Sequence, residues 1–191
     1  MIAATVDDPL KSDSRSDPEL IAAINDGDSD AFEALYYRYR DWVVGLAYRF
    51  TSDRELALDV LQETFLYFAR KFPGFRLTAQ LKTFLYPAVR NLSIAARRKA
   101  ERFRSDENET GTIEAVMTAE PALSHDDSLA AALAVLSEEH REVLLLRFVD
   151  GLSLAEIAEA VTIPLGTVKS RLHNALACLR RDPQTKGYFE K

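Results

Sequence analysis

The chain has 191 residues, of which 47% are hydrophobic and 28% are charged, as in an ordinary soluble globular protein. It holds no apolar run near the roughly 20 residues that span a bilayer, and its polar, acidic residues 1–18 argue against a signal peptide or anchor. The single cysteine, Cys178, excludes an internal disulfide and a multi-cysteine zinc site, so we expect a reducing, cytoplasmic location.

Charge is segregated along the chain, although the net charge of −6 taken alone argues against a nucleic-acid partner. Residues 1–33 carry 9 acids and 2 bases, a net of −7, whereas residues 34–104 carry 14 bases and 6 acids, a net of +8. Residues 105–130 hold 7 acids and no base, and residues 131–191 hold 8 of each. Because charges act within a Debye length of about 8 to 10 Å, the basic segment is compatible with a phosphate backbone.

Helical periodicity dominates the first half of the chain, and no segment alternates as a strand does. Apolar residues recur there at steps of three and four, which predicts an all-α fold. Two capping boxes predict where helices begin. They are Asp30 with Glu33, before a helix over residues 31–50, and Ser52 with Glu55, before a helix over residues 56–72.

A third helix is predicted over about residues 79–103, after Pro73 and Gly74 end the second. Pro87 lies inside this stretch and should kink the helix or mark a start nearby, because proline has no N–H to donate. The helix ends in a basic cluster of five residues: Arg97, Arg98, Lys99, Arg102 and Arg104.

Residues 105–127 are acidic, lack bases and contain few large apolar side chains, which predicts a flexible linker. Beyond it, helices are predicted over residues 129–136, 138–149, 154–161 and 165–179. The sequence therefore predicts two small helical domains joined by a flexible acidic linker. The parts are an acidic N-terminal segment (1–27), a first domain (28–104), the linker (105–127), a second domain (128–182) and a tail (183–191).

The second domain is predicted to end in a helix-turn-helix. Ser153 and Glu156 form a capping box before a short helix, and Pro164 is suited to begin the next one. The second helix places its apolar residues on one face and its polar, cationic residues elsewhere; the latter are Thr167, Lys169, Ser170, Arg171, His173 and Asn174. Such a helix fits the DNA major groove, but on spacing alone a helical hairpin with a solvated face is equally compatible.

Longer strings in both domains resemble one protein family. In the second domain these are LSEEHREVLLLR (136–147), GLS (151–153), EIA (156–158) and PLGTVKSRL (164–172). They resemble the promoter-binding C-terminal domain of extracytoplasmic-function (ECF) sigma factors. In the first domain, residues 28–39, DVLQETF (59–65), FPGF (72–75) and RNLSI (90–94) are similar to the other conserved half of that family.

The resemblance implies an alternative sigma factor that binds core RNA polymerase and directs promoter-specific transcription initiation. It implies that Asp59, Gln62, Glu63 and Phe65 bind the polymerase. It implies that the −10 element is held by Phe75, Arg76, Asn91, Arg97, Arg98 and Lys99. It implies that the −35 element is read by Thr167, Lys169, Ser170, Arg171, His173 and Asn174. An anti-sigma factor is an implied partner.

Each of these features has a plainer interpretation. The polar groups near Asp59 fit a solvated helix face, Phe75 fits a core aromatic, and the basic cluster fits a solvated helix end. The chain departs from the family pattern at several positions: Leu77, Thr78, Phe84, Pro87, Ala95 and Asn174. A sigma-like decoy for an anti-sigma factor and a stand-alone helix-turn-helix regulator are the alternative functions.

We predict no enzymatic activity, cofactor or metal. The sequence contains no glycine-rich phosphate loop, paired-carboxylate site or nucleophile–base set. Its histidines, such as His125 and His140, are scattered rather than clustered.

Overall fold

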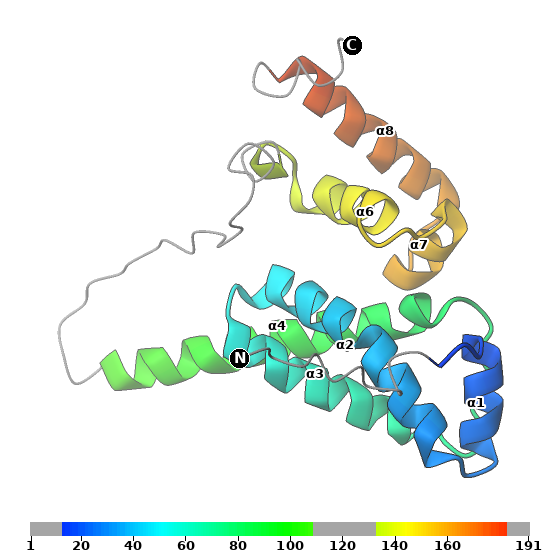
Figure 1. Cartoon of the computed structure of the whole chain (residues 1–191). Helices are drawn as coiled ribbons and strands as arrows, with labels where there is room; N and C mark the ends of the chain where they lie inside the picture. The colour runs from blue at the N-terminus through cyan, green and yellow to red at the C-terminus, as the bar shows by residue number, and fades with distance from the viewer. Residues whose placement is uncertain (1–12, 109–132, 183–191) are drawn as a thin grey trace, which may run out of the picture. The chain divides into compact units, whose positions relative to one another are not determined.

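The computed structural model describes residues 13–108 and 133–182, and these residues form helices joined by loops (Figure 1). They fall into two compact units, each of which is described by itself. Unit 1 (residues 13–108) contains α1 (Asp17–Asn25), α2 (Ser29–Thr51), α3 (Arg54–Ala69) and α4 (Leu81–Asn108). Unit 2 (residues 133–182) contains α6 (Glu138–Phe148), α7 (Leu154–Val161) and α8 (Leu165–Arg181). The all-α prediction is confirmed.

Helices α2 and α3 begin at aspartates rather than at the predicted capping boxes. Asp28 caps α2, its carboxylate accepting hydrogen bonds from the N–H groups of Asp30 and Ala31 at 2.9 and 3.1 Å. Asp53 caps α3 in the same way. The predicted boxes at Asp30 and Ser52 are therefore wrong. Each has an aspartate one or two residues away that satisfies the same orphan N–H groups with a charged acceptor.

Helix α1 was not predicted as an element, because its described residues lie in the predicted acidic segment 1–27. Its own residues Leu20 and Ile21 are buried, and the helix packs on α2. Polar contacts fasten its start to α2: Arg38 lies 2.6 Å from the Asp17 carboxylate, and the Tyr39 hydroxyl donates to the same group. Burial and that hydrogen bond raise the pKa of Tyr39 above its ordinary value of 10.0.

Helices α2, α3 and α4 pack against one another around an apolar core (Figure 1). Helix α3 ends at Ala69, three residues before the predicted end, since the residue preceding Pro73 is disfavoured in a helix. Helix α4 is continuous through Pro87, with Leu85, Tyr86 and Val89 buried around it. Tertiary packing of these neighbours offsets the hydrogen bond that proline cannot make. The helix therefore does not start at Pro87, and that half of the prediction is wrong.

Helix α4 also runs to Asn108, so the first four residues of the predicted linker are helical. The rest of that linker, residues 109–127, lies outside the described residues, as do residues 1–12 of the acidic segment and the tail 183–191. Within the described parts, no helix combines the length and the apolar character that crossing a membrane requires.

In unit 2, α6 and α7 both pack against α8. The predicted capping box is confirmed: Ser153 accepts from the Glu156 N–H, and the Glu156 carboxylate accepts from the Ser153 N–H at 2.8 Å. Thr162 adopts a left-handed conformation (φ 58°) that ends α7, and Pro164 precedes α8. The predicted face of α8 is buried: Val168, Ala175 and Leu179 lie in the core, with Leu172 partly buried. These residues form the predicted helix-turn-helix.

Candidate nucleic-acid and polymerase interfaces

The outer face of α8 is polar and cationic. Lys169, Ser170, His173 and Asn174 are exposed, whereas Thr167 is partly buried. The Ser170 hydroxyl donates to the Thr167 carbonyl at 3.0 Å, which leaves its oxygen free to accept. All of these side chains except Asn174, which lies just past the midpoint, are in the first half of the helix, where helix-turn-helix proteins place their base contacts.

Arg171 points away from this outer face. Its guanidinium lies 2.7 Å from the carboxylate of Glu139 at the start of α6, and only 19% of the arginine side chain is exposed. Of the two predicted cationic contacts, Lys169 alone is thus presented fully to solvent. Sequence periodicity could not distinguish the two, because the partner of Arg171 lies on another helix.

In unit 1, Phe75 belongs to an aromatic cluster. Its ring centroid lies 4.7 Å from that of Phe84, 5.4 Å from Phe68 and 5.5 Å from Phe72. The side chain is partly buried, so the core interpretation of Phe75 agrees with the geometry. The adjacent Arg76 is exposed.

One face of α4 leads from this cluster to the basic end of the helix. Phe84, Asn91 and Arg98 are seven residues apart, which places them on one side of the helix at intervals of about 10 Å. Asn91 and Arg98 are exposed. Arg97 is directed elsewhere, since its guanidinium contacts the Phe50 carbonyl of α2 at 3.5 Å and Glu101 at 3.4 Å.

Helix α3 exposes a mixed polar and apolar face. Asp59, Gln62 and Glu63 are exposed, as predicted, but Phe65 is only 5% exposed. Its ring packs against Phe32 and Tyr36 of α2 at centroid distances of 6.2 and 4.9 Å. The exposed apolar residues of this face are instead Leu58 and Leu66, at 43% and 50% exposure. Phe65 therefore belongs to the core, and a partner on this face meets Leu58 and Leu66.

Asn25 is a contact residue that the sequence did not reveal. Its side chain joins the end of α1 to the loop between α3 and α4 by three hydrogen bonds. Its amide donates to the Phe75 carbonyl at 2.9 Å, and its carbonyl oxygen accepts from the N–H groups of Gly74 and Phe75 at 2.6 and 3.1 Å. The partners are some fifty residues apart along the chain, so no local pattern predicts the contact.

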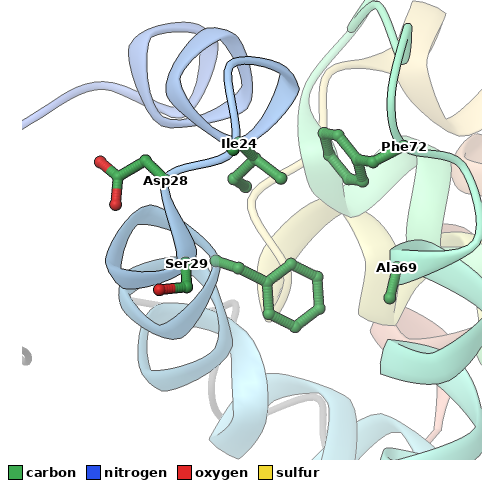
Figure 2. Close-up of a pocket in the computed structure, with 7 residues that line it drawn as sticks. Ile24, Asp28, Ser29, Ala69 and Phe72 are labelled. Carbon is green, nitrogen blue, oxygen red and sulfur yellow. The ribbon is translucent and has the colours of Figure 1, made fainter.

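An open pocket lies beside this contact, with a volume of about 230 Å³. Figure 2 shows Ile24 and Phe72 facing each other across it, with Ser29 and Ala69 on opposite sides. The lining is mainly apolar. In the described part of the chain, no group of three or more His, Cys, Asp or Glu side chains is arranged to hold a metal ion.

The helix-turn-helix of unit 2, with its exposed polar and cationic face, is typical of DNA-binding proteins, and comparison with known proteins identifies the family. Residues 35–103 match the family model "Sigma-70 region 2", and residues 132–181 match "Sigma-70, region 4". The chain belongs to the ECF RNA polymerase sigma factors.

Curated relatives support this assignment. The chain is 30% identical over 174 residues to the ECF RNA polymerase sigma factor SigW of Bacillus subtilis, covering 84% of this chain and 93% of that protein. It is 38% identical over 163 residues to the ECF RNA polymerase sigma factor SigL of Mycobacterium tuberculosis, covering 83% and 88%. It is also 31% identical over 176 residues to the RNA polymerase sigma-H factor of Pseudomonas aeruginosa, covering 83% and 89%.

Solved structures share the fold. The sigma factor RpoE of Bartonella quintana, solved with the anti-sigma factor NepR, matches with a TM-score of 0.57 and 25% identity over 78% of this chain and 94% of that one. CnrH, solved with the cytosolic domain of CnrY, matches with a TM-score of 0.61 and 22% identity over 85% and 93%.

The protein is thus an alternative sigma factor that directs transcription initiation. As a sigma factor it binds core RNA polymerase and promoter DNA, and its role is not enzymatic. The match to region 2 rules out the stand-alone helix-turn-helix regulator.

Proposed function

We propose that the two units divide the work of promoter recognition. Residues 28–104 bind core polymerase and the opened −10 strand, and residues 128–182 read the −35 element as duplex. The observation that carries the second role is the exposed polar and cationic outer face of α8, set on a helix whose opposite face is buried. A helix of that width enters the major groove, where each base pair presents a distinct pattern of donors and acceptors.

On α8, Lys169 and Asn174 are the residues best placed to contact DNA. Lys169 donates to guanine or phosphate, and Asn174, with Ser170 and His173, offers hydrogen bonds to base edges. Thr167 supports the start of this face. Arg171 serves mainly to hold α8 on α6 through Glu139, and it reaches phosphate only if that ion pair opens.

On unit 1, the opened strand follows the face of α4 that carries Asn91 and Arg98. Single strands are held by cationic side chains along the backbone and by groups that receive an unstacked base. Arg76 beside the aromatic cluster and Asn91 two turns from Phe84 are suited to read the base. Arg98 and Lys99 follow the phosphates, and Phe75 shapes the loop from within its aromatic cluster.

The polymerase contact is assigned to the exposed face of α3. Asp59, Gln62 and Glu63 supply polar groups, and Leu58 and Leu66 supply exposed apolar surface. Protein interfaces combine an apolar centre with a polar rim, which this face provides.

We also infer that an anti-sigma factor holds this protein inactive in the cytoplasm, since RpoE of Bartonella quintana was solved in complex with one. Run-off transcription with core polymerase on a genomic library tests the whole proposal and reveals the promoter. Transcripts that begin downstream of a common −35 and −10 pair are expected. A complex with core polymerase that initiates on no genomic fragment would contradict the proposal and favour a decoy for the anti-sigma factor.

A further inference from the structure

The side chain of Asn25 is the main polar support of the loop that joins α3 to α4. Within residues 13–108, residues 73–79 take part in no backbone-to-backbone hydrogen bond. Gly74 has a left-handed conformation (φ 97°), and its N–H meets the Asn25 carbonyl oxygen at 2.6 Å. Together with the bonds to both backbone groups of Phe75, the amide fixes the course of the chain at the start of the loop.

Apolar packing on this side of the loop is incomplete. The pocket in Figure 2 separates Ile24, the neighbour of Asn25, from Phe72 at the start of the loop. A gap of this kind removes van der Waals contacts between its walls. The hydrogen bonds of Asn25 therefore tie α1 to the loop beside a pocket where apolar contact is reduced.

Helix α1 is itself well anchored, so it can act as a fixed support. Leu20 is fully buried, and the Asp17 carboxylate is held by Arg38 and Tyr39 of α2. Asn25 is hydrogen-bonded to the backbone of Gly74 and Phe75, and Arg76 is the next residue of the chain. Any displacement of this backbone moves the Phe75 ring relative to Phe84. It also moves the exposed side chain of Arg76.

We propose that Asn25 is a positioning residue for promoter opening: it holds the α3–α4 loop in the conformation that receives the unstacked −10 base. This inference rests on the proposed function of unit 1. It makes α1 a working part of the −10 site, although Asn25 itself does not touch DNA. A pre-set loop avoids the conformational cost of ordering it when the base arrives.

Two variants separate the donor and acceptor roles of the amide. Asn25→Ala removes all three hydrogen bonds. Asn25→Asp keeps an acceptor for the Gly74 and Phe75 N–H groups, but it cannot donate to the Phe75 carbonyl and repels it. Asp26→Ala is the matched control, because Asp26 is the exposed neighbour of Asn25 and its side chain takes no part in the three hydrogen bonds to the loop.

The experiment uses the full chain with core polymerase on its duplex promoter. Strand opening is followed by permanganate reactivity of −10 thymines, and upstream duplex contact by footprinting. For Asn25→Ala we expect opening to slow by about tenfold, equivalent to one log unit in a rate constant. Core binding and the upstream footprint should stay within about twofold, and a template already unpaired over −10 should restore most activity. Asn25→Asp should lie between Ala and wild type, and Asp26→Ala should match wild type.

Opening by Asn25→Ala at the wild-type rate would overturn the inference. Loss of core binding together with opening would also overturn it, since Asn25 would then support the whole domain rather than the loop. Asn91→Ala in the same assay separates this failure from that of the proposed function. If Asn91→Ala slows opening and Asn25→Ala does not, only the role of Asn25 is wrong; if neither does, the −10 assignment to this face fails as well.

Discussion

The guanidinium of Arg171 on α8 and the carboxylate of Glu139 on α6 lie 2.7 Å apart. Glu139 is 65% exposed and Arg171 is 19% exposed, so the pair lies at the edge of unit 2 rather than in its core. Pairs in such positions typically stabilise a fold by about 0 to 1 kcal/mol. The pair matters more for orientation than for stability. It turns the Arg171 guanidinium of the recognition helix toward α6 of the same unit.

We therefore expect the two cations of α8 to differ in their contribution to DNA affinity. Lys169→Ala should weaken −35 binding and reduce the slope of log affinity against log salt by about one, the value for a lost phosphate contact. Arg171→Ala should change that slope less. The measurement is fluorescence anisotropy of a −35 duplex with the polymerase complex at several salt concentrations. Equal slopes for the two variants would show that the ion pair opens on DNA.

Removing both cations should separate the functions of the two units. Lys169→Ala combined with Arg171→Ala should abolish promoter-dependent transcription while leaving core polymerase binding intact, because the α3 face is unchanged. Run-off transcription and a polymerase binding assay measure the two properties. Loss of polymerase binding in the double variant would contradict the assignment of that task to unit 1.

On α3, replacing the adjacent residues Phe65 and Leu66 by alanine should affect two different properties, stability and core polymerase binding. Phe65→Ala should lower the free energy of unfolding by about 3 to 5 kcal/mol, since it leaves a cavity among the rings of α2 and α3. Leu66→Ala should change stability by only about 0.5 kcal/mol but weaken core polymerase binding. Urea unfolding and a competition assay for core polymerase measure these effects. Glu63→Lys, on the same exposed face, should resemble Leu66→Ala.

The hydrogen bond between Tyr39 and Asp17 predicts a pH dependence on the alkaline side. The folded state raises the pKa of Tyr39 above its ordinary 10.0, chiefly by burial and then through Asp17. The unfolded chain therefore loses this proton first, and the stabilisation, complete below pH 10.0, declines as pH rises beyond it. Tyr39→Phe should be less stable at neutral pH and show a shallower decline above about pH 10. Urea midpoints at neutral and alkaline pH measure both; parallel curves would place the decline in another group.

Local sequence patterns identified the helices, because helix periodicity and capping depend on neighbours within one or two turns; the family was indicated by the resemblance of longer strings in both domains. The helix-turn-helix is the clearest example: the Ser153–Glu156 box, the break before Pro164 and the buried face of α8 were all predicted and are present. The start of α2 was misplaced by local reasoning, because several acceptors compete for the same N–H groups and only one is positioned to bind.

The sequence by itself determined the helical class and the helix-turn-helix, since both depend on the spacing of residues along one segment, and the resemblance of strings in both domains indicated the ECF sigma factors. Only the tertiary structure decided which motif residues face a partner. Phe65 is buried and Leu66 exposed because α2 covers one side of α3; Arg171 is turned inward because Glu139 lies on a neighbouring helix. The contact of Asn25 with Gly74 spans 49 residues. Exposure and long-range hydrogen bonds depend on what packs against a segment, and that information is distributed over the whole fold.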